Sequence, residues 1–435
     1  MRSPGASASV PKPADAHSLR TLLILSTLMA FASISTDLYL PALPAMGTAL
    51  QADAGTIELT ISGYLIGFSL GQLLWGPIGD RYGRRLPIAI GLVLFIIGSA
   101  GCAVSISAEM LIGWRALQAV GACASVVLAR AMVRDLYTGH RAAQMMSTLM
   151  TVMAIAPLLG PSVGGQILHV ASWRAIFWTL VGVGLVTLAA LYALPETLPP
   201  ARRNREPLRR ALAGYSALLR HRRLLGYAGV VGFFYGGMYA YIAGTPFAYI
   251  TYYHVSPQHY GVLFGAGIVG IMITNQLNSR LVTRLGSDRL MRGGTIGAAI
   301  AGVLLAIDAS TGWGVLMGLV IPLFLLVSTT GFIVANSIAG ALGSFPERAG
   351  SVSALIGAIQ YGTGIIGSAL VGTCADGTPW PMGLIIALFG IGSLLCALFL
   401  VPSAAVTVRR PVACSHNQNL ETSCQEVTDR HFFHP

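Results

Sequence analysis

Charged side chains are scarce in this sequence. Asp, Glu, Lys and Arg together make up 10% of the 435 residues, whereas hydrophobic residues make up 54%. A soluble protein needs charge over most of its surface, usually about a quarter of its residues. The chain must therefore turn apolar side chains outward, which only lipid tolerates. The sequence predicts an integral membrane protein.

Signals of catalysis and of bound metal are missing as well. The histidines are scattered, and the sequence contains no CxxC pair, no Gly-Lys-Ser/Thr phosphate loop and no nucleophile–base pair. We therefore expect no cofactor and no ATP, and a membrane enzyme such as a lipid transferase is disfavoured. Cys102, Cys123 and Cys396 lie inside apolar runs and Cys374 ends one, which predicts buried thiols.

Several sequence patterns are absent, and their absence excludes other classes of protein. No apolar core with a cleavage site follows the polar first 18 residues, so we expect no removable signal peptide. The alternating strands of a β-barrel are absent. A ring of carbonyls or charges that would suit a passive channel is also absent. The net charge of +11 falls in short loops rather than in a basic soluble domain, so we expect no nucleic-acid partner.

Apolar runs long enough to cross a bilayer, roughly 20 residues each, occur twelve times. These runs must be helices, because lipid offers backbone groups no hydrogen-bonding partner. The predicted spans are 21–46, 57–78, 86–106, 109–131, 143–168, 174–194, 226–250, 259–281, 292–308, 313–337, 351–373 and 382–402. The fold class is an all-α membrane protein.

The basic residues orient these spans. With a cytoplasmic N-terminus, 25 of the 27 Lys and Arg residues fall on the cytoplasmic side, and Arg174 alone lies outside. The sequence therefore predicts that both termini are cytoplasmic. The predicted segments are an N-terminal stretch 1–20, a six-helix bundle 21–194, a basic linker 195–225, a second six-helix bundle 226–402 and a cytoplasmic tail 403–435.

The two halves echo one another at an offset of about 203 residues. Arg81 and Gly83 after the second span correspond to Arg284 and Gly286 after the eighth. An internal duplication of this kind predicts two bundles that rock about a central cavity.

Placing an ionisable side chain inside the membrane costs several kcal/mol, so each one found there suggests a functional or structural role. Of the sixteen acids, only Asp37 lies well inside a predicted span, while Glu58 and Glu109 sit at outer ends. Of the bases, only Arg115 lies inside a span. Asp37 and Arg115 are therefore candidates for proton coupling or substrate binding. A structural ion pair between their helices is the alternative.

Other side chains suggest a substrate cavity. Tyr235 and Tyr239 lie one turn apart in the aromatic-rich seventh span, and could stack on a flat apolar substrate. Some aromatics of this region, especially Tyr252 and Tyr253, are expected to belong to the interfacial belt. Asn336 and Gln360 lie in the middle of their predicted spans. They could line the same cavity, or they could only hold neighbouring helices together. Further candidates for the cavity are Tyr39 and Gln118.

Five motifs over roughly residues 20–402 resemble the major facilitator superfamily, and within it the twelve-span drug:proton antiporters of the Bcr/CflA type. The segment 76–85, Gly-Pro-Ile-Gly-Asp-Arg-Tyr-Gly-Arg-Arg, matches the superfamily's loop motif. The other matches are the arginine motif 115–121, the antiporter motif 156–165 with Ala156 in place of its usual first glycine, the Bcr/CflA-like signature 36–44, and Pro195-Glu196-Thr197.

The resemblance implies the major facilitator fold and roles for named residues. It implies a conformational gate of Gly76, Asp80, Arg81, Gly83, Arg84 and Arg85. Simple positive-inside anchoring by the arginines is the alternative, and we expect the glycines to form a tight turn. It also implies an antiporter motif of Gly160, Pro161, Gly164 and Gly165, for which tight helix packing is an equal alternative.

The function implied is export of small amphipathic drugs against inward proton flow, with the proton gradient as energy source. The alternative is a same-fold transporter of a metabolite such as a sugar or amino acid. We expect the partners to be a small-molecule drug, protons and the lipid bilayer of a bacterial inner membrane. We expect the protein to act as a monomer.

Overall fold

The structure is a computed structural model that describes residues 19–137, 139–203, 215–216, 218–345 and 348–401. The described residues form one compact unit. The predicted tail, most of the predicted N-terminal stretch and residues 204–214 of the predicted linker lie outside the described residues. Its first half contains α1 (Leu19–Asp37), η2 (Leu40–Ala42), α2 (Leu43–Leu50), α3 (Ala54–Tyr82), α4 (Arg85–Ala103), α5 (Ala108–Leu136), α6 (Gly139–Val170), α7 (Trp173–Leu191) and η3 (Pro200–Arg202). Its second half contains α9 (Arg222–Pro246), η4 (Phe247–Tyr252), α10 (Pro257–Leu285), α11 (Ser287–Thr311), α12 (Val315–Ser328), α13 (Thr330–Gly343), α14 (Ala349–Thr373) and α15 (Trp380–Phe399).

Twelve helical segments cross the membrane. Eleven segments of the described chain are long and apolar enough to do so, with α1 to α2 and α12 to α13 each counted as one. The twelfth is α9, whose 25 residues have the length of a span but include several glycines and tyrosines. No strand occurs among the described residues. The prediction of an all-α protein with two six-helix bundles is confirmed.

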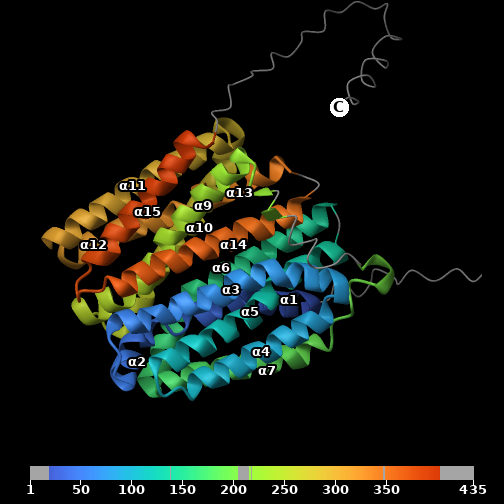
Figure 1. The fold of residues 1–435 in the computed structure, drawn as a ribbon, viewed down its shortest axis with the longest axis horizontal. Coiled ribbons are helices and arrows are strands. Elements are labelled where there is room, and N and C mark those ends of the chain that lie inside the picture. Colours follow the sequence, from blue (N-terminus) through green and yellow to red (C-terminus); the bar gives the residue numbers. More distant parts are fainter. Residues whose placement is uncertain (1–18, 138, 204–214, 217, 346–347, 402–435) are drawn as a thin grey trace, which may run out of the picture. The chain divides into compact units, whose positions relative to one another are not determined.

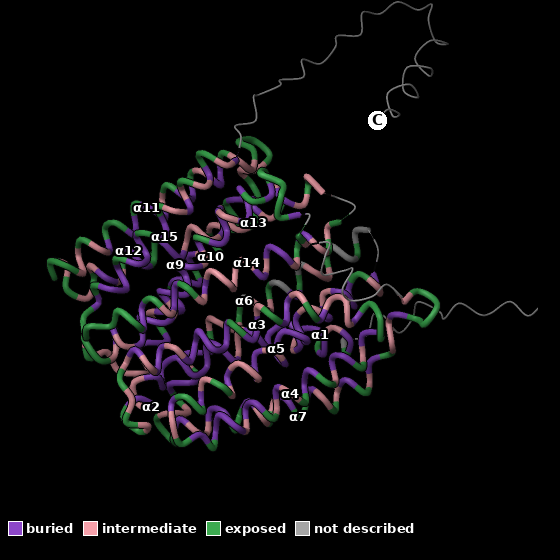
Figure 2. Tube along the Cα trace, in the orientation of Figure 1, coloured by how far each residue is buried: buried purple, intermediate pink, exposed green. Residues whose placement is uncertain are grey.

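The outward faces of the helices are apolar. On α4, the exposed side chains of Leu86, Ile90, Val93 and Ile97 are spaced by four, three and four residues. That spacing places them on one face of the helix. Figure 2 shows exposed segments along the outer faces of the helices and buried ones between them. An apolar stripe of this length belongs against lipid tails.

The internal repeat is visible in the helices themselves. α3 and α10 each have 29 residues, and their first residues, Ala54 and Pro257, are 203 positions apart. Each ends at a glycine with positive φ, +94° at Gly83 and +82° at Gly286. Only glycine adopts that backbone conformation at no steric cost, so both halves make the same sharp turn into the next helix.

Three of the predicted spans are interrupted rather than continuous. The first stops at Asp37 and resumes through η2 and α2, because Pro41 and Pro44 lack the N–H that would continue the helix. The seventh changes to a π-helix after Pro246. The tenth is divided at Thr329 into α12 and α13. The break after Asp37 places that carboxylate where the backbone of the first span unwinds.

The halves pack through equivalent pairs of helices. α1 contacts α6 in the first half, as α9 contacts α14 in the second (Figure 1). Between the halves, α3 packs against α14, and α10 packs against α6. The second helix of each bundle thus contacts the fifth helix of the other. This reciprocal packing of second and fifth helices is the arrangement expected if two similar bundles rock against each other.

We call the end of the helices that carries Arg84 and Asp135 the basic end, and the opposite end, where α3 begins, the far end. At the far end the bundles touch through small residues. A methyl group on Gly55 would lie 2.0 Å from the carbonyl oxygen of Gly372. Ser62 and Ser368, nearby on the same two helices, join their hydroxyls at 2.8 Å. The two backbones are therefore in contact there.

The thiols follow the prediction only in part. Cys102 and Cys123 are buried, but Cys396 is only half-buried and Cys374 is exposed at the far end. It follows the last residue of α14, so its side chain lies beyond the packed helix rather than within it.

Candidate functional site

Asp37 is the last residue of α1 and precedes the break in the first span. Only 5% of its surface is exposed. In the described part of the chain its carboxylate has no hydrogen bond and no ion pair. The segment that follows it, η2, contacts α9 and α10 of the second bundle. Asp37 therefore lies next to the contact between the bundles, and no ion pair among the described residues compensates its charge.

Gly160 and Gly164 of α6 pack on this carboxylate-bearing turn. A methyl group on Gly160 would lie 3.0 Å from Cβ of Asp37, and one on Gly164 would lie 1.8 Å from the carbonyl oxygen of Leu38. Real Cβ atoms do not approach that closely, so only glycine fits at position 164. The predicted antiporter motif thus lies directly against the predicted proton-coupling residue.

The remaining residues of that motif contact the other bundle. A methyl group on Gly165 would lie 2.7 Å from the carbonyl oxygen of Pro257, at the start of α10. Pro161 lies inside α6, as does Pro157, and the helix continues through both. One face of α6 therefore contacts α1, and the adjacent face contacts α10. In this way α6 connects the turn that carries Asp37 to the interface between the two bundles.

Arg115 does not pair with Asp37, although α5 and α1 are in contact. The ion pairs of the described residues all involve Arg84. The Arg115 Nη1 instead donates to the carbonyl oxygen of Ser35 at 2.9 Å and to Oε1 of Gln118 at 2.5 Å. Gln118 in turn donates to the Ser99 hydroxyl at 2.7 Å. The guanidinium is held inside the first bundle by the carbonyl group two residues before Asp37, and the alternative of an ion pair between the two helices is wrong.

Aromatic rings supply the rest of the Arg115 environment. Its guanidinium carbon lies 4.1 Å from the ring centre of Tyr39 and 4.4 Å from that of Tyr64. Cation–π attraction of this kind is strong when both groups are desolvated, and Arg115 is fully buried. The Tyr39 hydroxyl contacts the Thr60 hydroxyl at 3.2 Å. Tyr39 and Gln118 therefore lie within the first bundle around Arg115.

A row of aromatic rings crosses from one bundle to the other. On α3, the rings of Tyr64 and Phe68 are 6.0 Å apart. Phe68 lies 4.5 Å from Tyr361 of α14, and Tyr361 lies 6.0 Å from Tyr239 of α9. Tyr239 and Tyr235 are 6.2 Å apart. We call these five residues the aromatic row. It joins the two tyrosines identified from the sequence to three rings that sequence reasoning missed.

The two predicted mid-span amides occupy different surroundings. Asn336 is buried and donates to Oδ1 of Asn278 at 2.7 Å, so it joins α13 to α10 within the second bundle. Gln360 precedes Tyr361 on α14 and is partly exposed. Of the two, Gln360 is the one adjacent to the aromatic row.

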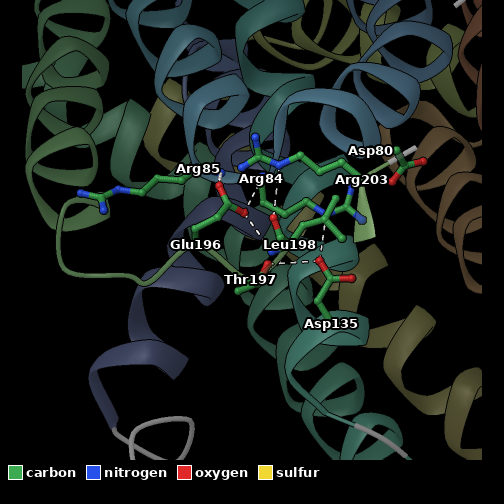
Figure 3. Close-up of polar contacts among 8 residues, drawn as sticks. All are labelled: Asp80, Arg84, Arg85, Asp135, Glu196, Thr197, Leu198 and Arg203. Carbon is green, nitrogen blue, oxygen red and sulfur yellow. Dashed lines mark hydrogen bonds and ion pairs between the residues drawn. The ribbon is translucent and has the colours of Figure 1, made fainter. Parts of the chain in front are cut away.

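A second polar cluster lies at the basic end, around Arg84 (Figure 3). The Arg84 Nη1 donates to Oδ1 of Asp80 at 2.6 Å, and its Nε donates to Oδ2 of Asp135 at 2.8 Å. The Thr197 hydroxyl donates to the same oxygen of Asp135 at 3.1 Å. Burial opposes the charge of Arg84, but these carboxylates hold the pKa of its guanidinium above the ordinary value. We call this cluster the latch.

Glu196 clamps the turn beside the latch. Its Oε1 accepts from the backbone N–H of Arg84 at 2.8 Å, and its Oε2 accepts from that of Arg85 at 3.1 Å. Burial disfavours the ionised form, but these bonds, a third from Leu198 and the charge of Arg203 hold the pKa of Glu196 below its usual range. The carboxylate is therefore ionised at neutral pH.

The remaining residues of the predicted gate are spread along α3 and the turn. Gly83 makes the turn, and a methyl group there would lie 2.7 Å from Oε2 of Glu196. Gly76 was predicted to share this turn and does not, because α3 continues to Tyr82. Arg81 is exposed, with its guanidinium 5.6 Å from the Tyr82 ring.

Sequence reasoning missed Asp135 as a partner of the latch. The available signal was an acid among the basic residues that end the fourth span, directly after Arg134. Arg85 does not join the ion pairs of the latch. It donates to the carbonyl oxygen of Tyr192 at 3.1 Å, which ties the turn to the end of α7.

The latch makes a testable prediction. Asp80→Asn removes an ion pair whose acid is half-exposed, which is worth up to about 1 kcal/mol. Such a change alters the ratio of two conformations about fivefold. We therefore expect transport to slow several-fold while the melting temperature stays within about a degree. Initial rates in proteoliposomes measure this.

Asp135→Asn should slow transport more than Asp80→Asn, because it leaves the buried Arg84 with a single half-exposed carboxylate. Arg280→Gln, at an exposed position of the other bundle, is the matched control and should transport at the normal rate. Normal rates in both aspartate variants would leave the arginines as topological anchors only.

Comparisons with known proteins agree with this arrangement. A sequence model of the family described as Major Facilitator Superfamily matches residues 23–368. An uncharacterised MFS-type transporter of Bacillus subtilis is 37% identical over 88% of this chain and 96% of its own length. A bicyclomycin resistance protein homolog of Haemophilus influenzae is 31% identical over 83% of this chain and 90% of its own. A chloramphenicol resistance protein of Pseudomonas aeruginosa is 32% identical over 83% of this chain and 86% of its own.

A solved structure shares the fold. The crystal structure of a D-xylose–proton symporter superposes with a TM-score of 0.68 and 18% identity, and covers 88% of this chain and 98% of that one. At that identity the likeness concerns the arrangement of helices alone.

Proposed function

The chain belongs to the major facilitator superfamily, and on that premise we propose that it exports small amphipathic drugs in exchange for protons. It is a multi-pass membrane transporter and not an enzyme. The relatives named for resistance to bicyclomycin and to chloramphenicol support a drug as the substrate.

The observation that carries the proposal is the unpaired carboxylate of Asp37 between the two bundles. A buried ion without a partner is costly, so this group needs a proton or a bound cation to compensate it. It lies where the helix unwinds and where α6 packs, and both are places that movement of the bundles changes. A proton and a substrate that compete for one carboxylate displace each other, and that competition is exchange.

The aromatic row supplies the apolar part of the binding surface. Its rings come from α3, α14 and α9, so both bundles contribute. Tyrosine and phenylalanine rings bind flat apolar molecules by stacking and carry few hydrogen-bonding groups that would select one structure. A surface of this kind favours several unrelated amphipathic drugs over a sugar, which needs a dense set of polar contacts.

Orientation follows from the charges. The basic end holds the latch and most of the arginines, so we place it in the cytoplasm, together with both termini. The far end then faces outward from a bacterial inner membrane. We propose that the protein works as a monomer, that the proton gradient is its energy source, and that it uses no further cofactor.

Uphill drug movement is the direct test of the function. Everted membrane vesicles that contain the protein are energised by a proton gradient, and accumulation of antibiotics from several classes is compared with that in vesicles without it. A deletion and overexpression screen in a drug-sensitive bacterium selects the antibiotics. Exchange of a sugar or amino acid, with no drug moved, would favour the metabolite transporter instead.

The aromatic row makes its own prediction. Tyr239→Ala should weaken binding of flat aromatic drugs by about 1 kcal/mol, which is about fivefold in Kd, because one stacking surface is removed. Smaller aliphatic substrates should be affected less. Binding to the purified protein, measured by calorimetry, checks this.

Tyr252→Ala is the matched control for that experiment, because Tyr252 is exposed at the far end of the second bundle. It should leave all affinities unchanged. Equal loss for every drug, together with poor expression of Tyr239→Ala, would identify Tyr239 as a packing residue.

A further inference from the structure

A second acid lies inside the membrane, at the far end. Glu58 belongs to α3, one turn from the residues where α3 meets α14, and only 3% of its surface is exposed. Its Oε2 is buried without a hydrogen-bond partner among the described residues. A methyl group on Gly372 of α14 would lie 3.5 Å from Cβ of Glu58. The carboxyl group is therefore covered by the other bundle.

Among the described residues, no cation forms an ion pair with Glu58. Asp53, the acidic N-cap of the same helix, lies five residues earlier, and its charge repels a second negative charge. Of the helices packed against α3, α2 has no titratable side chain and α14 has only Tyr361. Glu109, at the start of α5 and at the same end of the helices, is exposed.

The charged groups of the remaining neighbours are distant or engaged elsewhere. Arg115 of α5 is bound to Ser35, Gln118 and the two tyrosine rings. Arg222 and Arg223 of α9 and Arg85 of α4 lie at the basic end. A carboxylate buried beside another acid and away from any cation is too costly to keep ionised. In the closed arrangement Glu58 must carry a proton.

Separation of the bundles changes this balance. The contacts that cover Glu58 are Gly55 with Gly372 and Ser62 with Ser368, and all of them join one bundle to the other. When these contacts part, water reaches the carboxyl group and its ionised form is no longer penalised. Opening of the far end and release of one proton are then linked, because each favours the other.

We propose that Glu58 is a proton-binding site that locks the outer gate, taking a proton from the external medium when the gate closes and returning it to the same side when the gate opens. This inference rests on the proposed function for the orientation of the far end. It differs from the role of Asp37, because this proton does not cross the membrane. External acid therefore favours closure of the gate after the drug has left.

The test follows gate opening without any drug. Ser368→Cys is introduced into a full-length protein whose six native cysteines are replaced by alanine, and a membrane-impermeant maleimide is added outside intact cells. Maleimide reacts with the thiolate, so any cysteine labels faster as the pH rises. The labelling rate of the Ser368→Cys protein is therefore divided, at each pH, by the rate of a protein that retains only the exposed Cys374. We expect this ratio to rise with external pH, by up to about tenfold per pH unit for one linked proton. Glu58→Gln cannot ionise, so its ratio should be low and independent of pH.

Three further variants make the result interpretable. Glu109→Gln, the exposed glutamate at the same end, should keep the pH dependence. Asp37→Asn should keep it too, which separates the gate from the coupling carboxylate. Gly55→Ala forces the helices apart, since its methyl group would lie 2.0 Å from the Gly372 oxygen, and should label fast at every pH.

A protein that retains only the exposed Cys374 reports insertion and orientation in each background, because it should label from outside at all pH values. The inference is overturned if Glu58→Gln labels with the same pH dependence as the parent, or if Asp37→Asn removes that dependence while Glu58→Gln does not. Failure of drug export in vesicles would contradict the proposed function. It would not change the interpretation of this labelling result.

Discussion

Asp37→Asn is expected to abolish pH-driven, uphill drug efflux while binding of uncharged drugs survives. Asparagine has nearly the same shape, so the break after α1 and its packing on α6 remain. It cannot exchange a proton, so drug movement is no longer tied to the gradient. Accumulation in everted vesicles should fall to the level of vesicles that lack the protein, whereas calorimetry should still show binding.

Asp53→Asn is the control for that experiment. Asp53 is exposed and caps α3, and asparagine caps a helix as well as aspartate does, so only the charge is removed. Uphill efflux should continue in this variant. Continued uphill efflux in Asp37→Asn would show that the buried acid is only structural.

Gly164→Ala is expected to destroy transport through packing rather than chemistry. Its methyl group would lie 1.8 Å from the carbonyl oxygen of Leu38, so α6 and α1 must separate around the carboxylate. Overpacking of this kind costs about 1–3 kcal/mol. We expect efflux to be lost and the melting temperature of the purified protein to fall by roughly a few degrees.

Gly182→Ala in α7 is the matched control, because no atom lies within 4 Å of the added methyl group. Alanine favours a helix over glycine by up to about 1 kcal/mol, so this variant should be as stable as the parent or slightly more stable. Full transport by Gly164→Ala would mean that α1 and α6 do not need their close contact.

The helices and the repeat were predictable from the sequence, because apolar length and basic loops are local properties. The interruptions were harder to predict. Pro41 and Pro44 lie in the signature 36–44 of the first span, but hydropathy shows a continuous apolar run whether or not the backbone unwinds inside it. The length of α3 was underestimated because hydropathy ends the span at the polar residues of its basic end. The helix itself continues through those residues to Tyr82.

Contacts between the two halves could not be predicted from the sequence. Glu58 lies near the start of a span, which predicts an exposed outer acid, and only the packing of Gly372 shows that it is buried. Tyr361 lies in a glycine-rich span with no aromatic neighbour in sequence, so nothing marked it as a partner of Phe68. Arg115 was identified correctly as the basic residue within a span, but its partners are a carbonyl, the side-chain oxygen of Gln118 and two rings.

At the far end α3 and α14 meet backbone to backbone at Gly55 and Gly372, and hydroxyl to hydroxyl at Ser62 and Ser368. Such a contact separates without any side chain changing its rotamer or leaving a pocket, so little activation energy goes into repacking. The peptide groups and hydroxyls uncovered at these four residues are readily solvated by water. The same two backbones can therefore meet again in register after every cycle.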